Sequence, residues 1–377
     1  MDPRLLRIPS LTSLRAAVAT FVALAVPDAH AAQTTLDVSS RLSCEKCRIG
    51  LTRVATLGDA SGPGAVQQQG GVVMDSRGRY LVTSNFDAGR VKVFDSRGVY
   101  RRDLGRPGKG PGEFTGRPLL FPVADSIVAF DLSLRRITVF GPDLNAIRSF
   151  GFQGFLSGIA RAPAGRLFVA ANVATRSRIG LPLHLVDSGG HLVRSFGQVD
   201  GKVDASDPLS AVRIIAEGSG GRIWTARLNA YQLESWDSSG ELRRRVQRHT
   251  DWFVPWARAN GIQGLVRQPP STVGLQERGL DSLWVLIRVD DADWKIRPPT
   301  PVKGTDASRT SDADKELIYD TIIEIVDAGR GRLVLSQRFA QNMIGFVSRD
   351  RVASYEEDAQ GSPRYVIWQL TLHVPKT

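Results

Sequence analysis

A strand–turn–strand pattern recurs along this chain at a nearly constant interval and restricts the possible folds more than any other feature. Its copies read VKVFDSRGVYRRDLG, ITVFGPDLNAIRSFG, LHLVDSGGHLVRSFG, LESWDSSGELRRRVQ and IIEIVDAGRGRLVLS. Alternating apolar residues on both sides of a tight turn rich in Asp, Ser and Gly are typical of a β-hairpin. The equivalent turn residues Asp95, Gly141, Asp187 and Asp237 are 46, 46 and 50 residues apart.

A second motif comes before several of these hairpins. The segments RGRYLVTS, AGRLFVAA and GGRIWTAR each place a glycine turn ahead of a β-rich strand. The repeating unit therefore has four strands, which we name a to d. Four-stranded units of about 40–50 residues predict a β-propeller, because each small sheet buries its faces only against its neighbours.

The units run over 70–105, 116–151, 154–197, 210–248, 272–339 and 343–372, so the prediction is an all-β, six-bladed β-propeller. The last unit contains only three strands. The early segment LTRVATLG, which ends at Gly58, resembles strand d of the other units. We therefore expect this N-terminal strand to complete the last blade and close the ring, which also removes an exposed sheet edge.

This closure explains a repeated loop sequence. LGRPGKGPGEF starts at Leu104 and has a degenerate echo, LGDASGPGAV, that starts at Leu57. We interpret both as the connection from a strand d to the next blade. Glycine supplies a positive φ in such a turn, and proline fixes its own φ.

The first blade, VVMDSRGRYLVTSNFDAGRVKVFDSRGVYRRDLGRPGKGPGEF, resembles the NHL repeat in its Asp-x-x-Gly turn, VFD strand and Gly-Pro-Gly-Glu-Phe linker. The mature chain as a whole resembles exported bacterial six-bladed β-propeller proteins related to NHL-repeat proteins. The third and fourth blades match less closely, and the fifth carries a long insertion. The resemblance implies a scaffold and does not identify an activity.

The N-terminus has the features of an export signal. Three arginines precede an apolar run of 11 residues from Ala16 to Val26, and Ala29-His30-Ala31 fits a cleavage site. The run is too short to span a hydrocarbon core of about 30 Å. We expect a signal peptide at 1–31, an N-terminal segment at 32–50 and the propeller at 51–377, in a periplasmic or secreted protein with no membrane span after cleavage.

Two cysteines, Cys44 and Cys47, form a CEKC motif in the segment before the propeller. They are too few for a tetrahedral zinc site, and no histidine follows for haem attachment. A redox role would need a βαβ setting, which the sequence does not predict. Because exported proteins meet an oxidising environment, we expect a disulfide between them.

The net charge is +11 and remains about +10 without the predicted signal peptide. This charge favours anionic surroundings. However, the basic residues are scattered, and an exported protein does not normally meet nucleic acid, so we do not expect a nucleic-acid partner. No glycine-rich phosphate loop or dinucleotide motif is present, and we expect no cofactor.

The direction of the strands divides the connections between two faces. The a–b and c–d turns are short, and residues such as Asp75, Asp95, Asp187 and Asp237 suit caps of their own turns. The b–c and d–a connections include Gly105 to Arg117, Arg248 to Ser271 and the insertion from Asp290 to Leu317. Long loops often carry function, so this second, loop-rich face is the expected working surface.

Several polar and aromatic residues of the loop-rich face are candidates for ligand binding. Arginines suit anionic groups, and flat tryptophan rings suit sugars or other ring surfaces. The same tryptophans could instead hold their own loops on the propeller. The predicted ligand-binding residues are Asn85, Asp87, Arg117, Asp131, Arg227, Asn229, Trp252, Trp256, Arg288 and Trp294.

The sequence favours an exported binding module that recognises an anionic, carbohydrate or protein ligand on the loop-rich face. We expect no catalytic residues, because histidines are scarce and no Gly-x-Ser-x-Gly motif is present. We also expect no metal, because the starts of the a strands contain no carboxylate to hold a central cation. The alternative is a metal-assisted hydrolase or lyase of the lactonase-like propeller type. It would require Asp87, Asp131, Asn229 and Asp291 to converge on the axis.

Overall fold

A computed structural model describes residues 34–66, 70–84, 87, 89–173, 181–197, 211–257, 266–296, 300–301, 308–309, 318–358 and 362–375. The predicted signal peptide lies outside these residues. Within them, no helix is long and apolar enough to cross a bilayer.

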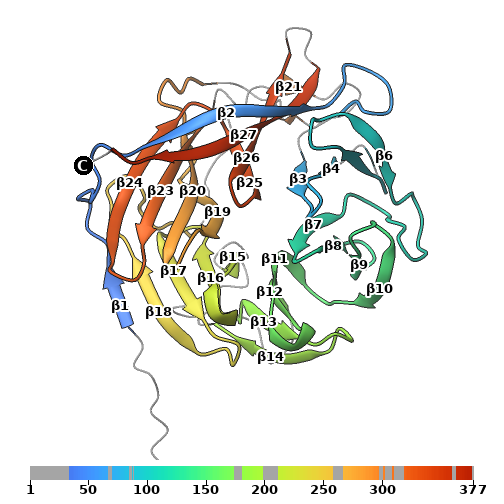
Figure 1. Cartoon of the computed structure of the whole chain (residues 1–377), viewed down its shortest axis with the longest axis horizontal. Coiled ribbons are helices and arrows are strands. Elements are labelled where there is room, and N and C mark those ends of the chain that lie inside the picture. Colours follow the sequence, from blue (N-terminus) through green and yellow to red (C-terminus); the bar gives the residue numbers. More distant parts are fainter. Residues whose placement is uncertain are drawn as a thin grey trace, which may run out of the picture. The chain divides into compact units, whose positions relative to one another are not determined.

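Six sheets surround a central axis (Figure 1). Blade 1 contains β3 (Gly71–Met74), β4 (Tyr80–Thr83), β5 (Val91–Phe94) and β6 (Tyr100–Leu104); blade 2 contains β7 (Leu119–Val123), β8 (Ser126–Asp131), β9 (Arg136–Phe140) and β10 (Ala146–Gly151); blade 3 contains β11 (Phe155–Arg161), β12 (Leu167–Asn172), β13 (Leu183–Val186) and β14 (Leu192–Phe196). Blade 4 contains β15 (Arg213–Glu217), β16 (Ile223–Arg227), β17 (Gln232–Trp236) and β18 (Leu242–Gln247); blade 5 contains β19 (Ser271–Glu277), β20 (Ser282–Asp290), β23 (Tyr319–Asp327) and β24 (Arg332–Phe339); blade 6 contains β25 (Met343–Ser348), β26 (Arg351–Glu357), β27 (Pro363–His373) and β2 (Arg48–Leu57).

The innermost strands complete a circle. They contact one another in the order β3, β7, β11, β15, β19, β25 and back to β3. Apolar side chains fill the space between neighbouring blades; for example, one buried cluster joins Phe130 of blade 2 to Val169 of blade 3. The predicted six-bladed β-propeller is confirmed.

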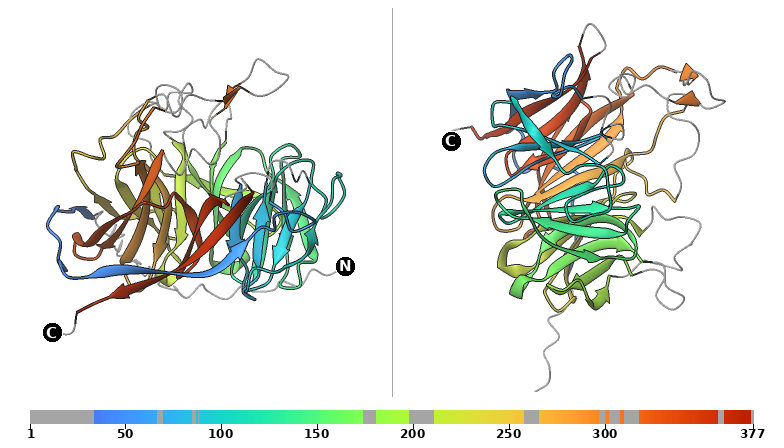
Figure 2. Two further views of the ribbon diagram at one scale, coloured as in Figure 1. Left: turned by 90° about the horizontal axis from the view of Figure 1, so that it is seen from above. Right: turned by 90° about the vertical axis from the view of Figure 1, so that its right-hand side faces the viewer.

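The last blade takes its outer strand from the start of the propeller, as predicted. β2 pairs antiparallel with β27, and Ala55 lies opposite Ile367. Figure 2 shows β2 running beside β27 although the two lie at opposite ends of the sequence. Leu57, at the end of β2, is fully buried in a cluster with residues of blades 1 and 6. The N-terminal strand therefore closes the ring.

The two Gly-Pro-Gly segments have equivalent positions after a strand d. In each, a parallel bridge ties the loop to itself, from Asp59 to Ala65 after β2 and from Pro107 to Phe114 after β6. Gly105 has φ +77°, and a Cβ there would lie 2.6 Å from the Phe114 ring, so no other residue fits without a shift. The repeated sequence is thus the connection between blades.

Residues ahead of β2 also contact the outer edge of the ring. β1 (Thr34–Asp37) pairs in parallel with β18 of blade 4, and Leu42 forms a bridge to Leu333 of blade 5. A disulfide then joins Cys44 to Cys47. Residues 34–47, within the segment predicted as 32–50, therefore contact the outer strands of blades 4 and 5 before β2 enters blade 6.

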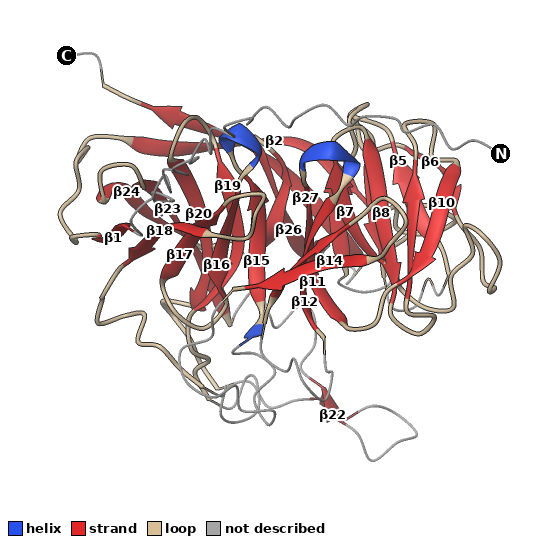
Figure 3. Cartoon of the chain, turned by 90° about the horizontal axis from the view of Figure 1, so that it is seen from below, coloured by secondary structure: helices blue, strands red, loops and turns tan. Residues whose placement is uncertain are grey.

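The two faces of the ring differ in their connections. In the short turns, the side chain of the first aspartate accepts hydrogen bonds from the amides of the residues two and four positions later in the chain. These contacts confirm the predicted turn caps Asp75, Asp95, Asp187 and Asp237. We call this side the turn face. The insertion of blade 5 contains a separate pair of strands, β21 (Thr300–Pro301) and β22 (Ser308–Arg309), and Figure 3 shows β22 set apart from the six sheets on one side of the ring.

Candidate functional site

A channel of about 880 Å³ follows the axis of the ring and is lined by residues of all six innermost strands and the connections next to them. Each innermost strand is the edge of its sheet, with strand b on one side only. Its other side, with main-chain N–H and C=O groups not used by the sheet, faces the axis. Apolar side chains such as Leu120, Ile215 and Phe346 lie between these edges. The channel wall is therefore mainly apolar with six strand edges.

Four charged residues line this channel. Arg117 comes just before β7 and lies at the loop-rich end, where the innermost strands begin. Glu217 and Glu277 end β15 and β19, and Arg349 follows β25, so these three lie at the turn-face end. The two ends of the channel thus differ in the charged groups that they present.

Arg117 is the one predicted ligand-binding residue among the described residues that line the channel. Its side chain is half-buried, and no described residue provides it with a hydrogen bond, an ion pair or an aromatic contact. A guanidinium keeps its charge at neutral pH and presents several donors in a plane. Arg117 therefore offers a positive charge to whatever occupies the loop-rich mouth.

The predicted acidic residues form hydrogen bonds or ion pairs with other residues of the protein. Asp131 is buried, and its Oδ2 accepts a hydrogen bond of 2.7 Å from the Thr115 amide, which fixes the loop between blades 1 and 2. Asp87 Oδ1 lies 3.5 Å from Lys92 Nζ. Burial raises the pKa of Asp87, although Lys92 acts in the opposite direction. Asn85 lies outside the described residues.

Asn229 and Trp256, on the loop-rich face, are joined by two hydrogen bonds. The Asn229 side-chain amide donates to the Trp256 carbonyl at 2.6 Å, and the Trp256 amide donates to the Asn229 carbonyl at 3.2 Å. The Trp256 indole N–H donates to the Pro270 carbonyl at 2.7 Å. These contacts fasten the connection between blades 4 and 5 to the propeller.

The other two tryptophans make contacts with arginines. The Arg248 guanidinium lies 5.9 Å from the centroid of a Trp252 ring, and Trp252 packs against a buried cluster of blades 4 and 5. The Arg267 guanidinium lies 5.2 Å from the centroid of a Trp294 ring. Such cation–π contacts hold loops as well as ligands. Both rings remain half-buried, so part of each surface stays accessible.

The remaining predicted arginines lie near the loop-rich ends of strands. Arg227 ends β16 and stands opposite the buried Arg213 in the register of β15 and β16. The Arg288 guanidinium lies 4.6 Å from the Tyr319 ring centroid. Together with Arg117, these residues place an arginine at this end of blades 2, 4 and 5.

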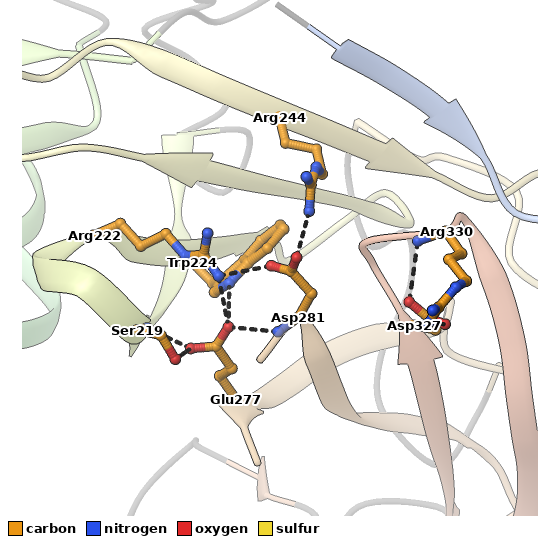
Figure 4. Close-up of polar contacts among 8 residues, drawn as sticks. All are labelled: Ser219, Arg222, Trp224, Arg244, Glu277, Asp281, Asp327 and Arg330. Atoms are coloured by element: carbon orange, nitrogen blue, oxygen red, sulfur yellow. Dashed lines mark hydrogen bonds and ion pairs between the residues drawn. The ribbon is translucent and has the colours of Figure 1, made fainter. Parts of the chain in front are cut away.

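The turn-face end of the channel contains an ionic cluster that the sequence did not indicate (Figure 4). Glu277 accepts a hydrogen bond of 2.7 Å from the Ser219 hydroxyl and forms an ion pair of 2.9 Å with Arg222. Burial acts to raise the pKa of Glu277, but the hydrogen bonds from Ser219, the Asp281 amide and Arg222 outweigh it and lower the pKa. Asp281 in turn joins Arg222 to Arg244, at 2.6 and 2.8 Å.

The described residues contain no group of three or more His, Cys, Asp or Glu side chains placed to hold a metal ion. The four residues of the metal-dependent alternative, Asp87, Asp131, Asn229 and Asp291, are not among those that line the channel. Asp291 instead accepts a hydrogen bond from the Asp293 amide at 2.6 Å within its own turn. The arrangement of these four differs from the one that the alternative requires.

No family model and no curated protein matches this chain. Solved structures share its fold. A protein of Bacteroides fragilis that is described as exported is similar over 92% of this chain and 100% of that chain, with 11% identity and a TM-score of 0.57. A member of the DUF4221 family from Bacteroides vulgatus is similar over 87% and 99%, with 10% identity and a TM-score of 0.56. At such low identity the likeness shows the propeller fold alone.

Proposed function

We propose that this protein is an exported binding module that takes an anionic ligand at the loop-rich mouth of its axial channel. The observation that carries this proposal is Arg117, a half-buried arginine that lines the channel and has no partner among the described residues. A partly desolvated guanidinium without a counter-charge is a favourable partner for a carboxylate, sulfate or phosphate.

The surroundings of Arg117 support an anionic ligand. Arg227 and Arg288 lie at the same end of the ring, and the carboxylates of Asp87 and Asp131 contact Lys92 and Thr115 rather than Arg117. The channel itself is concave and mainly apolar with a few polar groups, as small-ligand sites commonly are.

Export is part of the proposal. It rests on the predicted signal peptide at 1–31 and the disulfide between Cys44 and Cys47, and it agrees with the resemblance to exported propellers related to NHL-repeat proteins. Expression of the full chain in a bacterial host and N-terminal sequencing of the periplasmic fraction test it. A chain that begins at Ala32 is the expected product.

Paired small compounds test the binding proposal. We expect glucuronate or N-acetylglycine to raise the thermal midpoint of the mature protein in a saturable way, whereas glucose and N-acetylglycinamide should not. Arg117→Gln should weaken binding at least about tenfold, because a hydrogen bond to a charged group contributes about 1.5–3 kcal/mol. Binding should also weaken as salt rises.

The matched control is Arg97→Gln, which removes a side chain that is 79% exposed in a turn-face hairpin of blade 1. It should leave binding unchanged. The proposal fails if neither anion binds, or if both variants reduce binding equally.

A further inference from the structure

The turn-face end of the channel carries a second arginine without a partner. Arg349 lines the channel just after β25 and is exposed, and no described residue pairs with it. Both carboxylates at that end already have an arginine: Glu217 pairs with Arg161 at 3.9 Å, and Glu277 with Arg222 at 2.9 Å. Each end of the channel therefore presents one arginine that has no ion-pair partner among the described residues.

Arg349 has a second arginine close to it. Arg278 lies nearby, with its guanidinium 3.9 Å from the centroid of a Trp284 ring. Burial lowers the pKa of Arg278 to about 10, Asp350 acts against this change, and the charge of Arg349 adds to it. Asp350 accepts hydrogen bonds from Ser348 and Gln369. An anion beside Arg349 would relieve repulsion between the two arginines.

The channel wall between the two arginines favours one kind of chain. It consists mainly of the axis-facing edges of six strands, on which the N–H and C=O groups of every second residue recur at roughly 6.6 Å. An extended peptide matches this repeat and forms main-chain hydrogen bonds with a strand edge. An acyl chain would cover these polar groups without replacing their hydrogen bonds to water.

We infer that the channel takes an extended acidic peptide that spans the ring, with one carboxylate at Arg117 and a second at Arg349. This inference rests on the proposed function, because it adds a second contact to the same site. Arg117 precedes β7 and Arg349 follows β25, so the two lie at opposite ends of the channel in different blades. The six residues of β25 rise by roughly 20 Å, which sets the axial length that a ligand has to cover. Two glutamates at positions 1 and 7 of an extended peptide have that separation.

Three synthetic peptides test the inference by calorimetry on the mature protein. The first, acetyl-ESVTVSE-amide, carries both glutamates; the second has glutamine at position 7; the third, acetyl-QSVTVSQ-amide, carries neither. We expect the first to bind at least about tenfold more tightly than the second, because the second contact is intramolecular. Arg349→Gln should remove this gain and leave the second peptide unaffected. Arg97→Gln again serves as the control.

The outcomes separate the two proposals. If the second peptide binds in an Arg117-dependent way and the first shows no gain, the spanning peptide is wrong and the proposed function stands. If Arg349→Gln weakens both peptides equally, Arg349 is not a separate anchor and the inference is also wrong. If no anion of any kind binds, both proposals fail. If an oligogalacturonate shows the dependence on both arginines and the peptides do not, the ligand is an acidic sugar chain and the peptide assignment is overturned.

Discussion

At the scale of single residues, one side-chain arrangement recurs in the turns of four hairpins. In each turn, an aspartate carboxylate accepts hydrogen bonds from the amides two and four positions later in the chain; the aspartates are Asp75, Asp95, Asp187 and Asp237. The Val99 amide is the main reason that the pKa of Asp95 is lowered, and the His191 amide has this effect on Asp187. The turns of Asp95 and Asp187 thus keep their charged caps as the pH falls below neutral.

His184 makes the stability depend on pH in a milder range. It is buried in β13, with Nε2 3.1 Å from the Ala171 carbonyl and Nδ1 2.9 Å from the Ser195 hydroxyl. Burial lowers the pKa of His184 from its usual value of 6.5. The unfolded chain therefore binds the proton more readily, so this contribution to stability is complete above pH 6.5 and is lost as the pH falls toward the folded pKa.

We expect His184→Gln to reduce this pH dependence. Urea unfolding at pH 7.5 and 5.0 should show a larger loss of stability for the wild-type protein than for the variant. An exposed histidine, His249, supplies the control, because His249→Gln should leave the pH dependence unchanged. Identical losses in all three proteins would contradict the assignment to His184.

At the scale of elements, arginines on the turn face form ion pairs across three of the junctions between neighbouring blades. Arg77 pairs with Asp143 across blades 1 and 2, Arg194 with Glu241 across blades 3 and 4, and Arg222 with Glu277 across blades 4 and 5. Most of these pairs are exposed and contribute little individually. The pair of Arg222 and Glu277 is the exception, because the Glu277 side chain is only 3% exposed.

Glu277→Gln should therefore destabilise the protein by about 3 kcal/mol, since it leaves a half-buried arginine with one carboxylate fewer. Glu217→Gln is the matched control at the same end of the channel. Its side chain is 42% exposed, and the change should cost about 1 kcal/mol or less. Chemical denaturation measures both, and equal effects would show that burial does not determine the strength of these contacts.

At the scale of the whole molecule, the closed ring depends on β2, which pairs with β27 although it lies near the start of the described chain. Leu57 has no exposed surface and packs in the cluster that joins blade 6 to blade 1. Leu57→Ala should lower the free energy of unfolding by about 3 kcal/mol. Val54→Ala, at a residue that is 37% exposed, should cost less than about 1 kcal/mol.

Hydrogen exchange extends this test to the whole ring. If β2 closes the ring, Leu57→Ala should speed exchange in both β3–β6 and β25–β27, because the two blades share one buried cluster. Faster exchange in β2 alone would mean that the ring stays closed without it.

Most of the architecture could be predicted because its signals are local. Alternating side chains, aspartate turns and the spacing of the hairpins are properties of short segments, and six units with one missing strand require a closing strand. The site was less predictable. Of the described candidates, Arg117 lines the channel, whereas Asp131, Asn229 and Trp256 are bound to neighbouring loops. No local pattern distinguishes a residue that holds a loop from one that faces a ligand.

The sequence alone determined the number of blades, the closing strand and the sorting of connections between the two faces, because each follows from the order and length of the repeats. Only the tertiary structure decided which charges are compensated. Arg222 lies 55 residues before Glu277, and 232 residues separate Arg117 from Arg349. Closing the ring brings such distant positions to the same axis. Which arginines form an ion pair with a carboxylate therefore depends on the closed ring and not on the neighbouring sequence.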